Sequence, residues 1–105
     1  MRLEKREHPE AREELRDAAF WYDDRESGLG EDFTDAIDEA IARISDWPRS
    51  APVFPGWADT PTVHTMAVTM FPYRVLYYLA DTRFVILAYA HNRRKPRYWE
   101  HRLHR

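Results

Sequence analysis

The stretch RFVILAYA, Arg83 to Ala90, constrains the fold of this chain most strongly. It holds an unbroken apolar run, Phe84 to Ala90, rich in the β-branched and aromatic residues that favour strands. The run is far shorter than the roughly 20 residues of a membrane-spanning helix. It is also too apolar for a strand with one face in water. We therefore predict a strand at the centre of a sheet.

Two more strand patterns come just before this run. Val63 to Thr69 alternates loosely, and Tyr73 to Ala80 is dense in strand formers. Turn pairs separate the three patterns, Phe71-Pro72 first and Asp81-Thr82 second. Strands joined by such short connections predict an antiparallel meander of three strands.

The first half of the chain predicts a short strand and then two helices. The strand covers Arg2 to Glu7, and the first helix covers the stretch HPEAREELRDAAFWYDDR, with Pro9 in its first turn. Its apolar residues share one helical face: Ala11, Leu15, Ala18, Ala19 and Tyr22. A second helix runs from about Glu31 to Asp46, after a break at two glycines. Its stripe is Phe33, Ile37, Ala40, Ile41 and Ile44, and Pro48 ends it.

This order, β-α-α-β-β-β, predicts one α+β domain over residues 1–105, with the helical hairpin on one face of the sheet. The chain has 105 residues and no cysteine, which excludes disulfides and thiolate metal sites. The stretch MRLEKREHPE is charged from its second residue and lacks the apolar segment of a signal peptide. We expect a cytoplasmic protein that makes no membrane contact.

Charge is divided unevenly along the chain. Residues 1–47 hold 7 Lys or Arg and 15 Asp or Glu, and residues 48–105 hold 9 and 3. Formal charges of −8 and +6 therefore make up the net −2. The split predicts an acidic helical side and a basic sheet side, so a nucleic acid would approach the sheet.

The stretch AYAHNRRKPRYWEHR concentrates the positive charge at the end of the central strand. Its candidate binding residues are His91, Arg93, Arg94, Arg97 and Trp99. Arginines beside aromatic rings can hold bases or an acidic partner. The same residues also fit a solvated turn, with His91 bonding the turn and Trp99 anchoring the tail in the core.

Three strings in this order resemble one known family: WYDDRESGLGEDFTDAIDEAIARI, FPYRVLYY and LAYAHNRRKPRYW. Together they are similar to the RelE/ParE superfamily of bacterial toxins, over about Glu10 to Arg102. The FPYR string and the H-x-R-R-x-P-x-x-W ending are closer to the ParE-like, plasmid-stabilisation branch. The resemblance implies a type II toxin that inhibits growth and forms a hetero-oligomer with a cognate antitoxin.

The family contains two activities, and both remain open for this chain. The RelE-like branch cleaves mRNA in the ribosomal A site without a metal, and the ParE-like branch poisons DNA gyrase. For cleavage, the resemblance implies Arg74 and Arg93 or Arg94 as cations, with Tyr98 or His101 as proton donor. The strand over 63–69 should then supply two lysines, but it offers only threonines and an alanine at those positions. Gyrase inhibition needs no acid or base and is favoured; an inactive antitoxin-binding relative is the third alternative.

No cofactor is implied, and the pair His101 and His104 lacks the further ligands of a metal site. Phe20, Trp21 and Tyr22 are consecutive on the first helix, so at least one should project outward. Trp21 then either packs under the PVFPGW stretch or marks the antitoxin groove. We also expect acids of the antitoxin to cover the basic positions Arg93 and Arg94.

Overall fold

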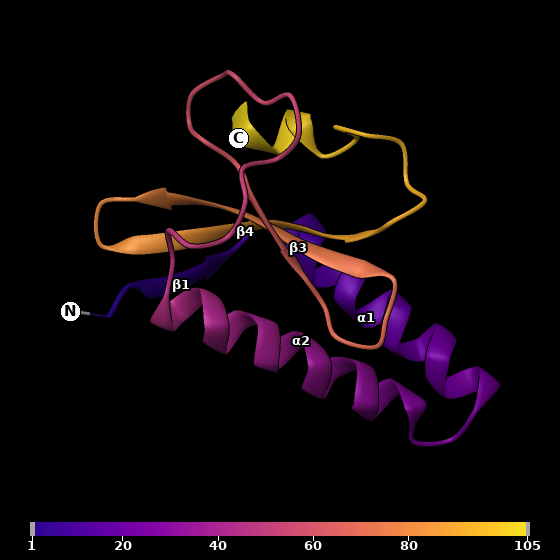
Figure 1. Cartoon of the computed structure of the whole chain (residues 1–105). Helices are drawn as coiled ribbons and strands as arrows, with labels where there is room; N and C mark the ends of the chain where they lie inside the picture. The colour runs from indigo at the N-terminus through magenta and orange to yellow at the C-terminus, as the bar shows by residue number, and fades with distance from the viewer. Residues whose placement is uncertain (1, 105) are drawn as a thin grey trace.

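The computed structural model describes residues 2–104 (Figure 1). Four strands, two long helices and a terminal 3-10 helix follow one another along the chain. In order they are β1 (Glu4–Glu7), α1 (Pro9–Arg25), α2 (Leu29–Asp46), β2 (His64–Ala67), β3 (Tyr73–Ala80), β4 (Arg83–His91) and η1 (Glu100–His104). The predicted order of strand, two helices and three strands is confirmed. The two terminal residues of the predicted domain, 1 and 105, lie outside the described residues.

The four strands form one sheet in the order β1-β4-β3-β2. The pairs β2–β3 and β3–β4 are antiparallel, as the predicted meander requires, and β4 lies inside the sheet. The remaining neighbour of β4 is β1, which pairs with it in parallel from Glu4 beside Arg83 to Glu7 beside Ile86. A parallel pair needs a long connection. Between β1 and β4 the chain passes through the helical hairpin, the long loop, β2 and β3.

The helical hairpin starts and turns at residues suited to those positions. The His8 ring accepts a hydrogen bond from the Glu10 backbone N–H, and Pro9 fills the first turn of α1. Gly28 lies between the helices with a left-handed φ of 92°. It lets α2 begin at Leu29, two residues before the predicted start. The Asp23 carboxylate caps this start by accepting bonds from the N–H groups of Gly28 and Gly30.

Other boundaries also differ from the predictions. β1 begins at Glu4 rather than Arg2, and β2 is limited to His64–Ala67. β4 extends one residue further, to His91. The terminal 3-10 helix η1 was not predicted, because its five residues, EHRLH, carry no apolar period.

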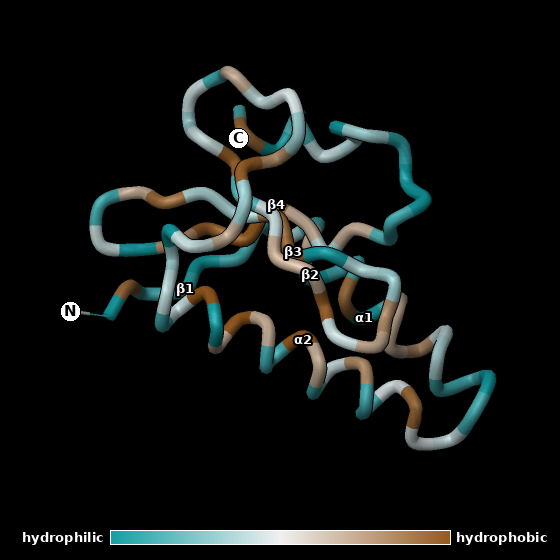
Figure 2. The backbone as a smooth tube through the Cα atoms, in the orientation of Figure 1, coloured by the Kyte–Doolittle hydropathy of each residue, from teal (hydrophilic) through white to brown (hydrophobic). Residues whose placement is uncertain are grey.

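Both faces of the sheet are covered, which is why β4 is apolar without alternation from Phe84 to Ala90. Helices α1 and α2 pack on one face around a cluster that includes Phe33, Ile37 and Ile86. On the opposite face, the long loop after α2 and the C-terminal segment enclose a second cluster, with Leu87 and Trp99. Figure 1 shows these segments on opposite sides of the sheet. Figure 2 shows that the stretch leaving β4 is strongly hydrophilic.

Candidate functional site: a basic cleft beside the C-terminal segment

A cleft of about 630 Å³ opens on the sheet face opposite the helices. We call it the basic cleft. The long loop forms one wall, residues that follow β4 form the other, and strand residues form the floor. Its lining is Pro52, Val53, Phe54, Pro55, Thr65, Arg74, Leu76, Ala90, His91, Asn92, Arg94, Lys95, Pro96, Tyr98 and Trp99. Three cationic side chains and a histidine therefore meet in one hollow whose lining contains no acid.

Arg74 lies half-buried on the floor of the basic cleft. Its Nε donates a hydrogen bond to Thr65 Oγ1 across the β2–β3 pair, at 2.5 Å. Thr65 is itself only 4% exposed. An alternative role for Arg74, read from the alternating pattern of its strand, is an ion pair at the sheet edge with an acid on the helices. Within residues 2–104 no such pair forms, because Arg74 lies on the sheet face away from the helices.

His91 ends β4 at the rim of the cleft. Its Nδ1 accepts a hydrogen bond from the Arg93 backbone N–H at 3.0 Å, and its ring meets Tyr73 edge to face at 5.1 Å. The expected role of His91 in bonding the turn is therefore confirmed. Because Nδ1 is an acceptor, a neutral His91 carries its proton on Nε2.

Arg94 and Tyr98 stack against each other in the opposite wall. The Arg94 guanidinium carbon lies 3.9 Å from the centroid of the Tyr98 ring. This stacking holds an exposed cation over an aromatic face while its donors remain available to a ligand.

The Tyr98 hydroxyl points away from any ligand in the cleft and donates to the Glu14 carboxylate at 2.5 Å. Burial raises the pKa of Tyr98 well above its ordinary value. The hydrogen bond to Glu14 and the charge of Glu14 raise that pKa further, and nearby Arg102 and Arg94 offset part of the rise. The proton of Tyr98 is thus held tightly, which is the opposite of what a proton donor needs.

Glu14 connects three parts of the molecule. Its carboxylate accepts hydrogen bonds from Tyr98, from both terminal nitrogens of Arg102 at 3.0 Å, and from the Tyr89 backbone N–H at 3.1 Å. Arg102 is 6% exposed and also donates to the Leu87 carbonyl. α1, β4 and η1 are therefore joined at one buried charge pair.

Three of the predicted binding residues lie outside the cleft or are buried. Arg93 is exposed beside it but does not line it. Arg97 lies 4.5 Å from the Trp57 ring centroid and is within 4 Å of carboxylates on Asp59 and Glu100. Trp99 is 1% exposed and packs against Trp57, so it is a core anchor, although it also lines the cleft.

Trp21 occupies a different hollow, of about 580 Å³, between α1 and the ends of β3 and β4. It is 52% exposed, with the Arg25 guanidinium 3.7 Å from its ring centroid. Trp21 therefore does not pack under the PVFPGW stretch. Its neighbour Phe20 is 71% exposed, which confirms that the aromatic trio projects outward in part. The hollow shares His91 and Arg94 with the basic cleft, so these two residues separate the two cavities.

Sequence reasoning missed Glu14 and Arg102 as parts of this region. For Glu14 a signal exists, since it lies within the apolar stripe of α1, three residues after Ala11 and four before Ala18. A charge on an apolar stripe indicates a buried partner. Arg102 carries no such signal, because its surroundings come from distant segments.

The arrangement favours binding of a phosphate or an acidic peptide by positive charge, without a prepared general acid. Within residues 2–104, no group of three or more His, Asp or Glu side chains could hold a metal ion. His101 contacts Glu10 at 3.1 Å instead. None of the helices in the described chain has the length and apolar character needed to cross a membrane.

Comparison with known proteins gives one kind of match. No protein-family model matches the sequence, and no curated protein matches it. Among solved structures, the chain is similar to one from the chromosomal ParDE TA system of P. aeruginosa, with a TM-score of 0.71. The match covers 85% of this chain and 95% of that chain, at 13% identity. This chain has a RelE/ParE-like fold. The predicted fold class is confirmed, while the low identity leaves the activity to chemical argument.

Proposed function

We propose that this chain is the toxin of a type II toxin–antitoxin module and that it inhibits DNA gyrase. The observation that carries the proposal is the fold shared with a chain of a ParDE TA system over nearly its whole length. The fold is arranged around a basic cleft suited to an anionic or acidic partner.

Gyrase inhibition is favoured over RNA cleavage by the chemistry of the cleft. Metal-free cleavage of RNA needs a group that removes the 2′-hydroxyl proton and one that protonates the leaving oxygen. The Tyr98 hydroxyl donates its hydrogen bond to the Glu14 carboxylate, and the β2 strand contributes Thr65 rather than a lysine. Inhibition of a protein target requires only a recognition surface.

Ribosome-dependent mRNA cleavage is the second candidate, because Arg74, His91, Arg94 and Tyr98 line one cleft. Two cations there could stabilise a pentavalent phosphate. The Nδ1 lone pair of His91 is already used by the Arg93 N–H, so the ring offers no free base in this arrangement. An inactive relative that only binds the antitoxin is the third.

The proposed partner is a cognate antitoxin that binds in the cytoplasm and carries acids opposite Arg93 and Arg94. These two arginines are exposed, and the exposed Trp21 lies next to the second hollow that shares Arg94. An antitoxin segment crossing from the hollow to the cleft would contact all three residues.

The test is tightly induced expression in a bacterium without the antitoxin, with pulse-labelling of DNA and protein synthesis. We expect DNA synthesis to stop first, and purified protein to block supercoiling by gyrase. Arg93→Glu/Arg94→Glu should reduce both effects, whereas Arg83→Glu, at the opposite end of β4, should not.

If translation stops before DNA synthesis, the result contradicts gyrase inhibition and favours mRNA cleavage. Arg74→Ala should then restore growth. If neither process declines, the chain is not a toxin of either kind. Binding to the antitoxin alone would then favour the inactive relative.

A further inference from the structure

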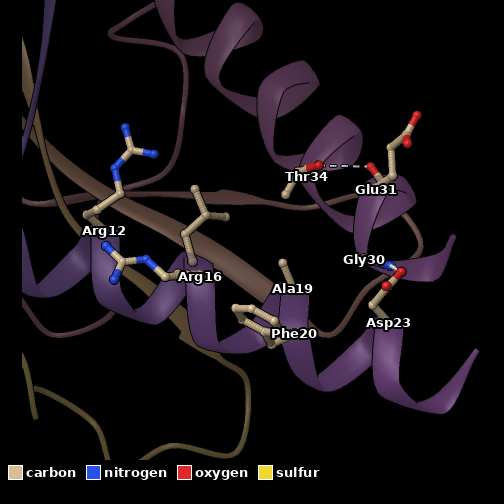
Figure 3. Close-up of a pocket in the computed structure, with 9 residues that line it drawn as sticks. Arg12, Arg16, Ala19, Phe20, Asp23, Gly30, Glu31 and Thr34 are labelled. Atoms are coloured by element: carbon tan, nitrogen blue, oxygen red, sulfur yellow. Dashed lines mark hydrogen bonds between the residues drawn. The ribbon is translucent and has the colours of Figure 1, made fainter. Parts of the chain in front are cut away.

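A groove of about 450 Å³ lies on the outer side of the helical hairpin, away from the sheet and from the basic cleft. We call it the hairpin groove. It is formed only by α1 and α2, from Arg12, Leu15, Arg16, Ala19, Phe20, Asp23, Gly30, Glu31 and Thr34. Figure 3 shows the two arginines at one end, Asp23 and Glu31 at the other, and Ala19 with Phe20 between them.

Phe20 makes the centre of this groove unusual for a free surface. Its side chain is 71% exposed although the hairpin buries its other apolar face against the sheet. Within the described residues, Phe20 contacts no other aromatic ring. A large exposed aromatic beside Leu15 and Ala19 is typical of a surface that another molecule covers.

The charges at the two ends have opposite sign and cancel within the groove. Arg12 pairs with Glu7 at 2.8 Å, and Asp23 caps α2. Between residues 2 and 104, the Arg16 guanidinium and the Glu31 carboxylate have no hydrogen-bond or ion-pair partner. The four charged residues of the groove therefore sum to zero net charge, although the hairpin as a whole is acidic. Among them, Arg16 and Glu31 are the cation and the acid that have no partner within the described residues.

Arg16 and Asp23, one at each end of the groove, are placed symmetrically along α1. Arg16 and Asp23 lie equally far from the point between Ala19 and Phe20, about 5 Å each at 1.5 Å per residue. A two-fold axis through that point would place the basic end of one groove on the acidic end of another. It would also bring the two Phe20 rings together. Isologous contacts require this self-complementarity, in which group i meets j and j meets i.

We propose that the hairpin groove binds a second copy of this chain, through an antiparallel contact between the two α1 helices. Phe20 packs against its counterpart near the axis, and Arg16 of each copy faces the acidic end of the other groove, which holds Asp23 and Glu31. The contact leaves the basic cleft open, because that cleft lies on the far face of the sheet. The proposal of a dimer does not depend on the proposed toxin function.

The first test measures the dimer directly, by sedimentation velocity of the purified full chain over a concentration series. We expect a monomer–dimer equilibrium. Phe20→Ser should raise the dimer Kd by about tenfold or more, as for an aromatic anchor at an interface centre. The matched control is Met70→Ser, which removes a side chain that is 92% exposed on the β2–β3 turn. It should leave the Kd unchanged.

The second test uses charge exchange at two exposed positions. Arg16→Glu and Glu31→Lys should each weaken the dimer, because each places like charges opposite one another twice. An equimolar mixture of the two variants should dimerise again, since one copy then carries both acids and the other both cations. The double variant in one chain should also recover the dimer. Far-ultraviolet circular dichroism and thermal unfolding check that every variant folds.

Three results would overturn the proposal. One is a chain that stays monomeric up to about 1 mM, where even a millimolar Kd would be visible. Another is a dimer unaffected by Phe20→Ser, and the third is a mixture of charge variants that remains monomeric. A monomer whose Phe20 becomes protected only by a different protein would assign the groove to that protein instead.

Discussion

At the scale of single residues, Glu14 is the side chain on which most of the C-terminal arrangement depends. Its side chain is 15% exposed and that of Arg102 is 5% exposed. Removing one charge of such a pair leaves the other buried without compensation, at a cost of several kcal/mol. We expect Glu14→Gln to lower the free energy of unfolding by about 3 kcal/mol in urea denaturation.

The matched control is Glu13→Gln, the same change one position earlier on the exposed side of α1. It should alter the free energy of unfolding by less than about 0.5 kcal/mol. Equal stabilities for the two variants would mean that the Glu14–Arg102 pair contributes nothing to the folded state.

Tyr77 predicts a pH dependence of stability. Its side chain is fully buried and donates to the Pro48 carbonyl at 2.7 Å. Burial raises the pKa of Tyr77 to about 12, from 10.0. The folded chain keeps a proton that the unfolded chain loses, so stability is complete below about pH 10 and falls as pH rises toward 12. Two pKa units correspond to about 3 kcal/mol.

The measurement is urea unfolding at several pH values between about 9 and 12. Burial also raises the pKa values of Tyr22, Tyr73, Tyr89 and Tyr98, so the wild-type slope contains contributions from all five tyrosines. Tyr77→Phe should make the decline shallower, whereas Tyr78→Phe, at a partly exposed position, should not. Identical slopes would exclude a contribution from Tyr77.

At the scale of elements, the close approach of α1 and α2 depends on Gly30. A Cβ at position 30 would lie 2.5 Å from the Ala19 carbonyl oxygen, so the helices must separate to accept it. Helix propensity alone would make Gly→Ala stabilising by about 1 kcal/mol. We expect Gly30→Ala to be destabilising instead, by about 1–3 kcal/mol, because the crowding exceeds that gain.

Thermal and urea unfolding measure the change in stability of Gly30→Ala. A loss of stability would show that crowding exceeds the propensity gain. Asp35→Ala, at an exposed position on α2, reports the propensity gain without crowding and should not destabilise. A more stable Gly30→Ala would show that the hairpin can open without cost.

At the scale of the whole molecule, the acidic helices and the basic cleft lie on opposite faces of one sheet. Positive charge that faces an acidic partner raises the association rate and makes binding sensitive to salt. We therefore expect the affinity for the proposed antitoxin partner to fall as ionic strength rises. Arg93→Glu/Arg94→Glu should weaken binding and flatten its salt dependence, measured by titration calorimetry.

The control for this experiment is Arg49→Glu/Arg83→Glu, which changes the net charge equally at two exposed positions outside the cleft. It should leave most of the affinity and the salt slope in place. Full antitoxin affinity in Arg93→Glu/Arg94→Glu would contradict the assignment of these arginines to the partner surface.

The sequence by itself determined what local physics controls. The apolar run over Phe84–Ala90 required an inner strand, and the stripe from Phe33 to Ile44 required a helix with one buried face. Charge division along the chain likewise predicted which side would be basic. Hydrophobic periodicity and turn residues act over a few neighbouring positions, so they can be read from the sequence before the fold is known.

Only the tertiary structure decided which distant groups meet. The parallel pairing of β1 with β4, the bonds from Tyr98 and Arg102 to Glu14, and the exposure of Phe20 depend on segments as much as 88 residues apart. No local pattern specifies such contacts, because a side chain's partners are set by how the elements pack. The same packing decided that Trp99 is core and that Arg74 and Arg94 line one cleft.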